Sequence, residues 1–353
     1  MTGETERQRY AIAPQMRVYD QLPMVLAPYV STTSRPDFRS EVVNTDDLGF
    51  RVSHGPSGPI DTQTWWHQRH RGLVIGNSFA FGVGATADQH TLASVLNSLT
   101  PYSFLNLGIR AANSTQELIA SIPFLDSVEL VVVCSGINNL VVGLQSLGKN
   151  ALFGPLFAES DFEELAACSI SDLAAIARSR LDRVGWHLLL REVSSRMLKK
   201  LLRTRKRSAH AESGTAGQAP ISDRDLKSVP EEALKRQRRD LSIMAKALSP
   251  HARLIFAAQP FADVSCKHLS PEEGRLFELL DGMQGVHWQI LKTSLGKFWP
   301  SYVTELRAMC SNDGIAFLDL NAVEFVGWSY VDRAHMTDDG YMQTARRIAE
   351  AIN

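Results

Sequence analysis

Short apolar runs alternate with helical segments along most of this chain, and that alternation constrains its fold more than any other feature. The runs predicted as strands are Leu73–Ile75, Tyr102–Leu107, Leu130–Cys134, Arg253–Ala258 and Ile315–Leu320. The patterns predicted as helices are Asp88–Leu99, Ser114–Leu125, segments within Pro271–Cys310, and Asp338–Ile352. Strands this apolar are typical of a parallel sheet that helices cover on both faces. We therefore expect an α/β fold in which all strands end at one edge of the sheet, where sites form.

The composition excludes several classes of function. The chain has 353 residues and a formal net charge of −1, so no overall field favours nucleic acid, and we expect no such partner. Its 4 cysteines are scattered without Cys-x-x-Cys pairs, which indicates a reducing compartment and neither a disulfide framework nor a metal site. Residues Met1–Tyr10 lack the apolar core of a secretory signal, so we expect a cytoplasmic protein.

A long insert interrupts the alternation of strands and helices. We expect residues 71–353 to form the main domain, residues 1–70 an extension that packs on it, and residues 145–250 a helical cap. Basic side chains crowd Arg196–Arg207, and a Ser/Ala/Gly-rich stretch, 208–220, is predicted to be a flexible loop. The basic run is most simply a solvated helix face; the alternative is a contact with a membrane surface or an acidic partner.

Ser78 is the first candidate for chemistry. The strand Leu73–Ile75 ends abruptly in Gly76-Asn77-Ser78, a small, turn-prone set before a helical segment. A serine on such a turn stands above the sheet edge, where its hydroxyl can meet a base and its N–H can face an oxyanion. The simpler interpretation of one such serine is a helix cap.

His335 is the candidate base. Of the ten histidines it alone has an aspartate, Asp332, three positions before it. On a tight turn that carboxylate can bind the imidazole Nδ1–H and leave Nε2 free to take a proton from a serine. The simpler alternative is a cap for the helix predicted from Asp338.

Two further residues could stabilise an oxyanion together with the Ser78 N–H. Gly108 follows a predicted strand with an unobstructed backbone N–H, and Asn138 follows the next strand with a carboxamide donor. Each alone would more simply be a turn residue.

Four segments in this order resemble the blocks of the SGNH (GDSL-type) hydrolase family. They are Gly76-Asn77-Ser78, Asn106-Leu107-Gly108, Gly136-Ile137-Asn138-Asn139 and Asp332-Arg333-Ala334-His335. The resemblance covers about 44–143 and 253–353 and implies a flavodoxin-like three-layer α/β/α fold. It implies Ser78 as nucleophile, Gly108 and Asn138 as oxyanion donors, His335 as base and Asp332 as its orienter, with no cofactor and no metal. Family members hydrolyse acyl esters and thioesters, and some transfer the acyl group instead.

Asn77 and Asn139 depart from the family pattern, which usually has aspartate at both positions. Neither position delivers a proton in the implied mechanism, so we expect altered hydrogen bonding in the turns rather than lost chemistry. Both could contact substrate, and so could Arg110 and Arg333, although surface ion pairs are the simpler role for the arginines. Trp65 and Trp66 could stack on a sugar ring or pack in the body of the protein.

Several other functions remain as alternatives. Gly82-Val83-Gly84-Ala85-Thr86-Ala87 loosely fits a dinucleotide-binding loop, but its glycines come too late after the strand and no acidic residue ends the next one. The sequence favours a serine esterase that removes a short acyl group from a small-molecule ester, such as an acylated carbohydrate or related metabolite. An acyltransferase with the same residues, or a catalytically silent module that binds a membrane or partner, are the alternatives.

Overall fold

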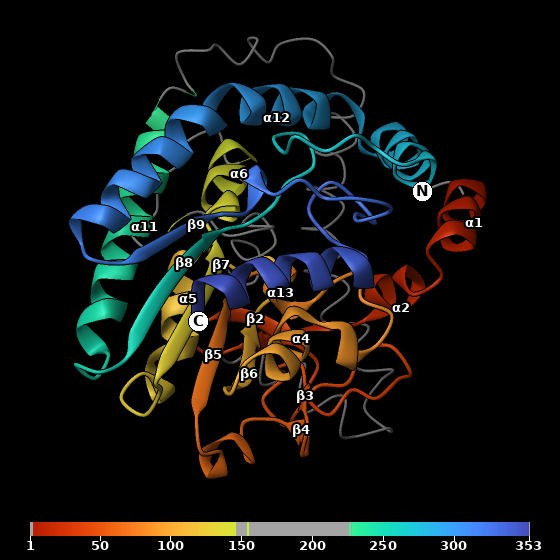
Figure 1. Ribbon diagram of the computed structural model, residues 1–353. Helices are drawn as coiled ribbons and strands as arrows, with labels where there is room; N and C mark the ends of the chain where they lie inside the picture. Colours follow the sequence, from red (N-terminus) through yellow and green to blue (C-terminus); the bar gives the residue numbers. More distant parts are fainter. Residues whose placement is uncertain (1–2, 146–153, 155–225, 227, 353) are drawn as a thin grey trace, which may run out of the picture. The chain divides into compact units, whose positions relative to one another are not determined.

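A parallel sheet of five strands forms the centre of the fold (Figure 1). The computed structural model describes residues 3–145, 154, 226 and 228–352. The strands are β5 (Arg71–Gly76), β6 (Ser103–Gly108), β7 (Leu130–Ser135), β8 (Arg253–Ala258) and β9 (Ala316–Asp319). They lie in the order β6-β5-β7-β8-β9, and every neighbouring pair is parallel. This is the flavodoxin-like strand order, and it confirms the predicted α/β class.

Helices cover the two faces of this sheet (Figure 1). They are α3 (Ser78–Phe81), α4 (Leu92–Leu99), α5 (Ser114–Ser121), α6 (Ile137–Gln145), α11 (Ser228–Ala247), α12 (Pro271–Asn312) and α13 (Asp338–Ile352). Helix α4 packs against α13, whereas α11 packs against α5, α6 and α12. The two groups form the outer layers of a three-layer sandwich.

The first 70 residues contribute small elements and several core side chains. The elements are α1 (Gly3–Ile12), α2 (Met16–Gln21), and the antiparallel hairpins β1 (Met24–Ala27) with β2 (Ser31–Ser34) and β3 (Ser53–Gly55) with β4 (Gly58–Ile60). Met16 and Tyr19 belong to the same buried apolar cluster as Val74 of β5.

Most of the predicted insert, 145–250, lies outside the described residues, including the basic run Arg196–Arg207 and the loop 208–220. Its last part is helix α11, which packs on α5 and α6. Within the part of the chain that the structure describes, no helix combines the length and the apolar character needed to cross a bilayer.

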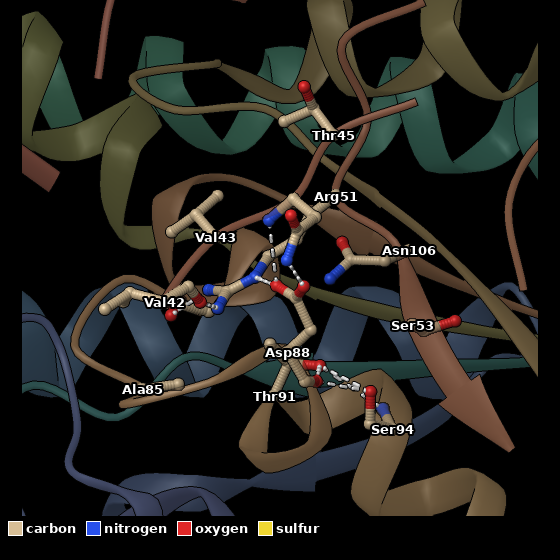
Figure 2. Close-up of polar contacts among 12 residues, drawn as sticks. Val42, Val43, Thr45, Arg51, Ser53, Ala85, Asp88, Thr91, Ser94 and Asn106 are labelled. Atoms are coloured by element: carbon tan, nitrogen blue, oxygen red, sulfur yellow. Dashed lines mark hydrogen bonds and ion pairs between the residues drawn. The ribbon is translucent and has the colours of Figure 1, made fainter. Parts of the chain in front are cut away.

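A buried ion pair joins the N-terminal segment to the loop before α4 (Figure 2). Arg51 is fully buried, and its Nε donates to Asp88 Oδ1 over 2.7 Å. The guanidinium also donates to the Gly82 carbonyl, to the Val42 carbonyl and to the Tyr19 hydroxyl, so its charge is surrounded by acceptors. Since a buried charge is tolerated only when it is paired and hydrogen-bonded, this cluster fixes how the N-terminal segment packs.

We predict that Arg51→Met lowers the free energy of unfolding by about 3–5 kcal/mol, because it leaves the Asp88 carboxylate buried without its partner. The matched control is Arg347→Met. That residue pairs with Glu350 on the surface, where the side chains are 49% and 65% exposed, so the cost is at most about 1 kcal/mol. Urea unfolding of both variants measures the difference, and equal losses would contradict the role of the Arg51–Asp88 pair.

Candidate active site

The end of strand β5 places Ser78 at the carboxyl edge of the sheet. Gly76 has φ of 156°, and a Cβ there would lie 2.2 Å from the Cys134 carbonyl oxygen, so only glycine fits. Asn77 then caps α3, because its Oδ1 accepts the Phe79 N–H over 2.9 Å. Ser78 is the first residue of α3 and is half-buried.

His335 and Asp332 meet Ser78 in a hydrogen-bonded chain. The Ser78 Oγ lies 2.7 Å from His335 Nε2, and His335 Nδ1 lies 2.8 Å from Asp332 Oδ2. The structure therefore brings together residues 257 positions apart in the sequence. This geometry suits transfer of the serine proton to the imidazole.

The charge state of Asp332 fits that arrangement. Burial alone would raise the pKa of this carboxyl, but the His335 charge and hydrogen bond, together with the Ala334 N–H, hold the pKa below its usual range. The backbone N–H groups of Ala334 and His335 both donate to Asp332 Oδ1 over 2.9 Å. The ionised carboxylate favours the tautomer with the proton on Nδ1, which leaves Nε2 free as an acceptor.

The turn that carries His335 is fastened to the rest of the fold. Tyr330 and Met336 form an antiparallel bridge, and the Val331 N–H donates to the His335 carbonyl over 3.0 Å. Arg333 is 8% exposed and pairs with both Asp263 and Asp281 of the neighbouring segments. Its guanidinium therefore anchors the turn, and the predicted contact of Arg333 with substrate is not supported.

Gly108 is not the donor that the sequence predicts. Its N–H already donates to the Asn106 Oδ1 over 2.9 Å. A Cβ at Gly108 would lie 2.1 Å from the Phe81 N, so glycine is required here for close packing of β6 on α3. Asn106 is fully buried and its carboxamide oxygen needs a donor, which explains why the N–H of Gly108 is occupied.

Ala111, in the turn that follows β6, is a candidate oxyanion donor that the sequence motifs do not indicate. Ala111 has φ of 64°, an unusual value for a non-glycine residue, and it is half-buried. Asn138, on the first turn of α6, donates its Nδ2 to the neighbouring Ala112 carbonyl over 2.8 Å, so this turn and Asn138 lie side by side. Among the described residues, neither the Ala111 N–H nor the Ser78 N–H has a hydrogen-bond partner. An alanine in a sequence gives no indication that its N–H could stabilise an oxyanion, because only the backbone conformation shows that this N–H is free.

Three of the predicted substrate contacts make hydrogen bonds within the protein instead. Asn77 and Asn139 are 0% and 2% exposed, so neither faces a substrate. The Asn139 carboxamide accepts from the Ser114 N–H and donates to Gln237. Arg110 donates to the Leu22 carbonyl over 2.8 Å and so fastens the hairpin of β1 and β2.

The two tryptophans lie at the edge of the sheet opposite to the one that carries Ser78. Trp65 is fully buried, and its Nε1–H donates to the carbonyls of Gly72 and Ser103, at the starts of β5 and β6. At about 3.3 Å per residue, the start of β5 is roughly 15 Å from the end that leads to Ser78. Trp66 stacks on Phe124 at a centroid distance of 5.4 Å. Trp65 therefore packs in the body of the protein, and neither tryptophan lies at the edge of the sheet that carries Ser78.

Comparison with known proteins gives only distant likenesses. No protein-family model and no curated protein matches the chain. Among solved structures, the aryl esterase of M. smegmatis is 10% identical, with a TM-score of 0.42 over 80% of this chain and 98% of that one. An extracellular lipase from Streptomyces rimosus is 12% identical, with a TM-score of 0.41 over 80% and 99%. Est24, a carbohydrate acetylesterase from Sinorhizobium meliloti, is 10% identical, with a TM-score of 0.38 over 80% and 98%. Likenesses this distant carry no argument about the chemistry of this chain.

Glu117 of α5 is a buried carboxyl next to the end of β7. It is 1% exposed, and its Oε1 accepts from the Ser135 hydroxyl over 2.8 Å at the end of β7. Among the described residues, its Oε2 has no partner. Burial raises the pKa of Glu117 to about 8; the Ser135 hydrogen bond opposes that shift and the Asp240 charge adds to it. Glu117 therefore holds a proton at neutral pH.

Within the described ranges, no group of three or more His, Cys, Asp or Glu side chains is placed to hold a metal ion.

We predict that Glu117→Gln removes a pH dependence of stability. The folded-state pKa of Glu117 is raised from 4.5 to about 8. Below pH 4.5 the carboxyl is protonated in both the folded and the unfolded state, so its burial as a charge costs no stability there. Between those two values the wild type loses about 1.4 kcal/mol of unfolding free energy per pH unit through this group. Urea unfolding at several pH values from 5 to 8 is expected to give a flatter profile for the variant than for wild type. Glu350→Gln, on the exposed surface, should leave the profile unchanged; parallel profiles for wild type and Glu117→Gln would contradict the assignment.

Proposed function

We propose that this chain is a serine ester hydrolase of the SGNH type. The observation that carries the proposal is the contact of 2.7 Å between Ser78 Oγ and His335 Nε2, with Asp332 on the other imidazole nitrogen. The Ser78 oxygen attacks the acyl carbonyl while His335 takes its proton. His335 then returns that proton to the leaving alcohol, and the acyl group stays on Ser78. Water, deprotonated by His335, releases the acid and restores the serine.

The tetrahedral oxyanion needs preorganised donors, and the segments that follow β5, β6 and β7 offer three candidates. We propose the Ser78 N–H, the Ala111 N–H and the Asn138 carboxamide. Ala111 replaces Gly108 in this role, because its N–H is free among the described residues whereas that of Gly108 is bound to Asn106. Each such donor is commonly worth about 3 kcal/mol of transition-state stabilisation.

The proposed substrate is an ester of a small acyl group with an alcohol. The preference for a carbohydrate depended on Trp65 and Trp66, and their position at the opposite sheet edge removes that support. An acyl-enzyme on Ser78 would also transfer its acyl group to an alcohol that reached it before water. Hydrolysis and transfer therefore differ in the acceptor and not in the residues, and the ratio of acid to new ester, measured with added alcohols, distinguishes them.

We predict that a fluorophosphonate probe labels the wild-type protein at Ser78. Labelling should be absent in Ser78→Ala. In His335→Ala its rate should fall by at least about 10³-fold, because the Ser78 hydroxyl then lacks its base. Peptide mapping by mass spectrometry locates the label. Ser301→Ala, an exposed serine of α12, serves as control and should label like wild type. Labelling that persists in Ser78→Ala, or a wild type that reacts with neither probe nor p-nitrophenyl esters, would favour the catalytically silent module.

We predict that Asn138→Ala lowers kcat for p-nitrophenyl acetate by about 10²–10³ with little change in KM, since the carboxamide acts on the transition state more than on the bound ester. Asn97→Ala removes a buried carboxamide near the opposite sheet edge, where its Nδ2 donates to the His54 carbonyl. That control should keep kcat. A change in KM alone for Asn138→Ala would place the residue in substrate binding instead.

A further inference from the structure

A buried glutamine that belongs to none of the sequence motifs links the two halves of the site. Gln259 follows β8 directly and is 1% exposed. Its side-chain Oε1 accepts from Asn77 Nδ2 over 2.6 Å, and its Nε2 donates to the Ala334 carbonyl over 3.3 Å. Asn77 precedes Ser78, and Ala334 precedes His335. One carboxamide therefore bridges the nucleophile turn and the base turn.

The backbone of Gln259 is fixed as firmly as its side chain. Its N–H donates to the Ser135 carbonyl over 3.1 Å, and its carbonyl accepts from Asn321 Nδ2 over 2.9 Å. All four polar groups of this residue thus have partners, at the end of β7, in the segments that follow β5 and β9, and in the His335 turn. A fully satisfied buried network of this kind is rigid, because every alternative position leaves a polar group unpaired.

The bridge requires a carboxamide at position 77 as well. Asn77 uses Oδ1 to accept from the Phe79 N–H and Nδ2 to donate to Gln259. A carboxylate at 77 would place an oxygen against Gln259 Oε1. Rotating the Gln259 carboxamide to relieve this would turn its oxygen toward the Ala334 carbonyl, also an acceptor. Asparagine where the resembling family usually has aspartate is therefore what allows Gln259 to reach both turns.

We propose that Gln259 is a positioning residue that holds the Ser78 and His335 turns at hydrogen-bonding distance. The inference rests on the proposed function for its catalytic consequence, but the geometry it describes is independent of the substrate. A displacement of about 1 Å between reacting groups can cost on the order of 10²-fold in rate. The residue itself touches neither the substrate nor a reacting atom.

The test compares Gln259→Leu with Asn97→Leu. Both variants remove a buried carboxamide with two side-chain hydrogen bonds, but the bonds of Asn97 go to His54 and Phe104, away from the site. For Gln259→Leu we expect kcat for p-nitrophenyl acetate to fall by roughly 10- to 100-fold with KM little changed. Asn97→Leu, measured at a temperature where both variants are folded, should keep the wild-type kcat. Equal kcat values for Gln259→Leu and wild type, or an equal loss in Asn97→Leu, would overturn the proposal.

A second variant covers the case in which Gln259→Leu does not fold. Gln259→Glu keeps an acceptor for Asn77 but sets an oxygen against the Ala334 carbonyl unless the new carboxyl is protonated. We expect its rate relative to wild type to rise as the pH is lowered, because the protonated carboxyl can again donate to Ala334. A ratio that does not vary with pH would overturn the bridge.

Crystal structures of wild type and a folded Gln259 variant separate this inference from the proposed function. Lengthening of the Ser78 Oγ–His335 Nε2 contact in the variant supports the positioning role even if no ester is turned over. An unchanged contact overturns that role even if the wild type is an active esterase.

Discussion

The parallel register of the central strands is the constraint on which the rest of the structure depends. It sets Gly108, Gly76, Cys134 and Ala257 in one row across four strands, so the segments that follow them all begin at the same edge. Ser78, the turn with Ala111, Asn138 and Gln259 lie within a few residues of that row. A shift of one residue in any strand would exchange the side chains on its two faces. In β7 every residue is buried, so such a shift would require both faces of that strand to repack.

The edge of the sheet is held together mainly by neutral carboxamides. Asn77, Asn106, Asn139 and Gln259 are each at most 2% exposed, and each joins loops that follow different strands or caps the loop it belongs to. A carboxamide both donates and accepts, so it satisfies backbone groups of either kind without burying a charge. Glu117 follows the same logic, since its raised pKa keeps it neutral. Asp332 is the ionised carboxylate that contacts His335, and its charge acts on that imidazole.

The sequence was sufficient for the five strands of the sheet and for the contact of Ser78 with His335 and Asp332, because both follow from local patterns and from the rule that parallel strands end at one edge. It was insufficient where the pattern of hydrogen bonds determines which polar groups are free. Nothing in Asn106-Leu107-Gly108 indicates that the asparagine occupies the N–H of the glycine. Of the two roles predicted for Trp65, packing in the body of the protein is the one found, because a residue that precedes a parallel strand lies at the opposite edge. Gln259 belongs to no motif, and its role appears only when four distant segments are assembled around it.

The N-terminal segment matters to Ser78 because α3, which begins at that residue, is too short to be stable alone. A helix of four residues has almost no stability of its own, so its position depends on its surroundings. The loop that follows, Gly82–Ala85, offers its carbonyls to distant side chains: Tyr19 donates to Gly82 and Ala85, Gln15 to Gly84, and Tyr341 to Val83. Arg51 adds a charged donor to the Gly82 carbonyl and is itself held by Asp88. The first 70 residues therefore supply donors to the loop that follows α3, and the position of Ser78 depends on them as well as on β5.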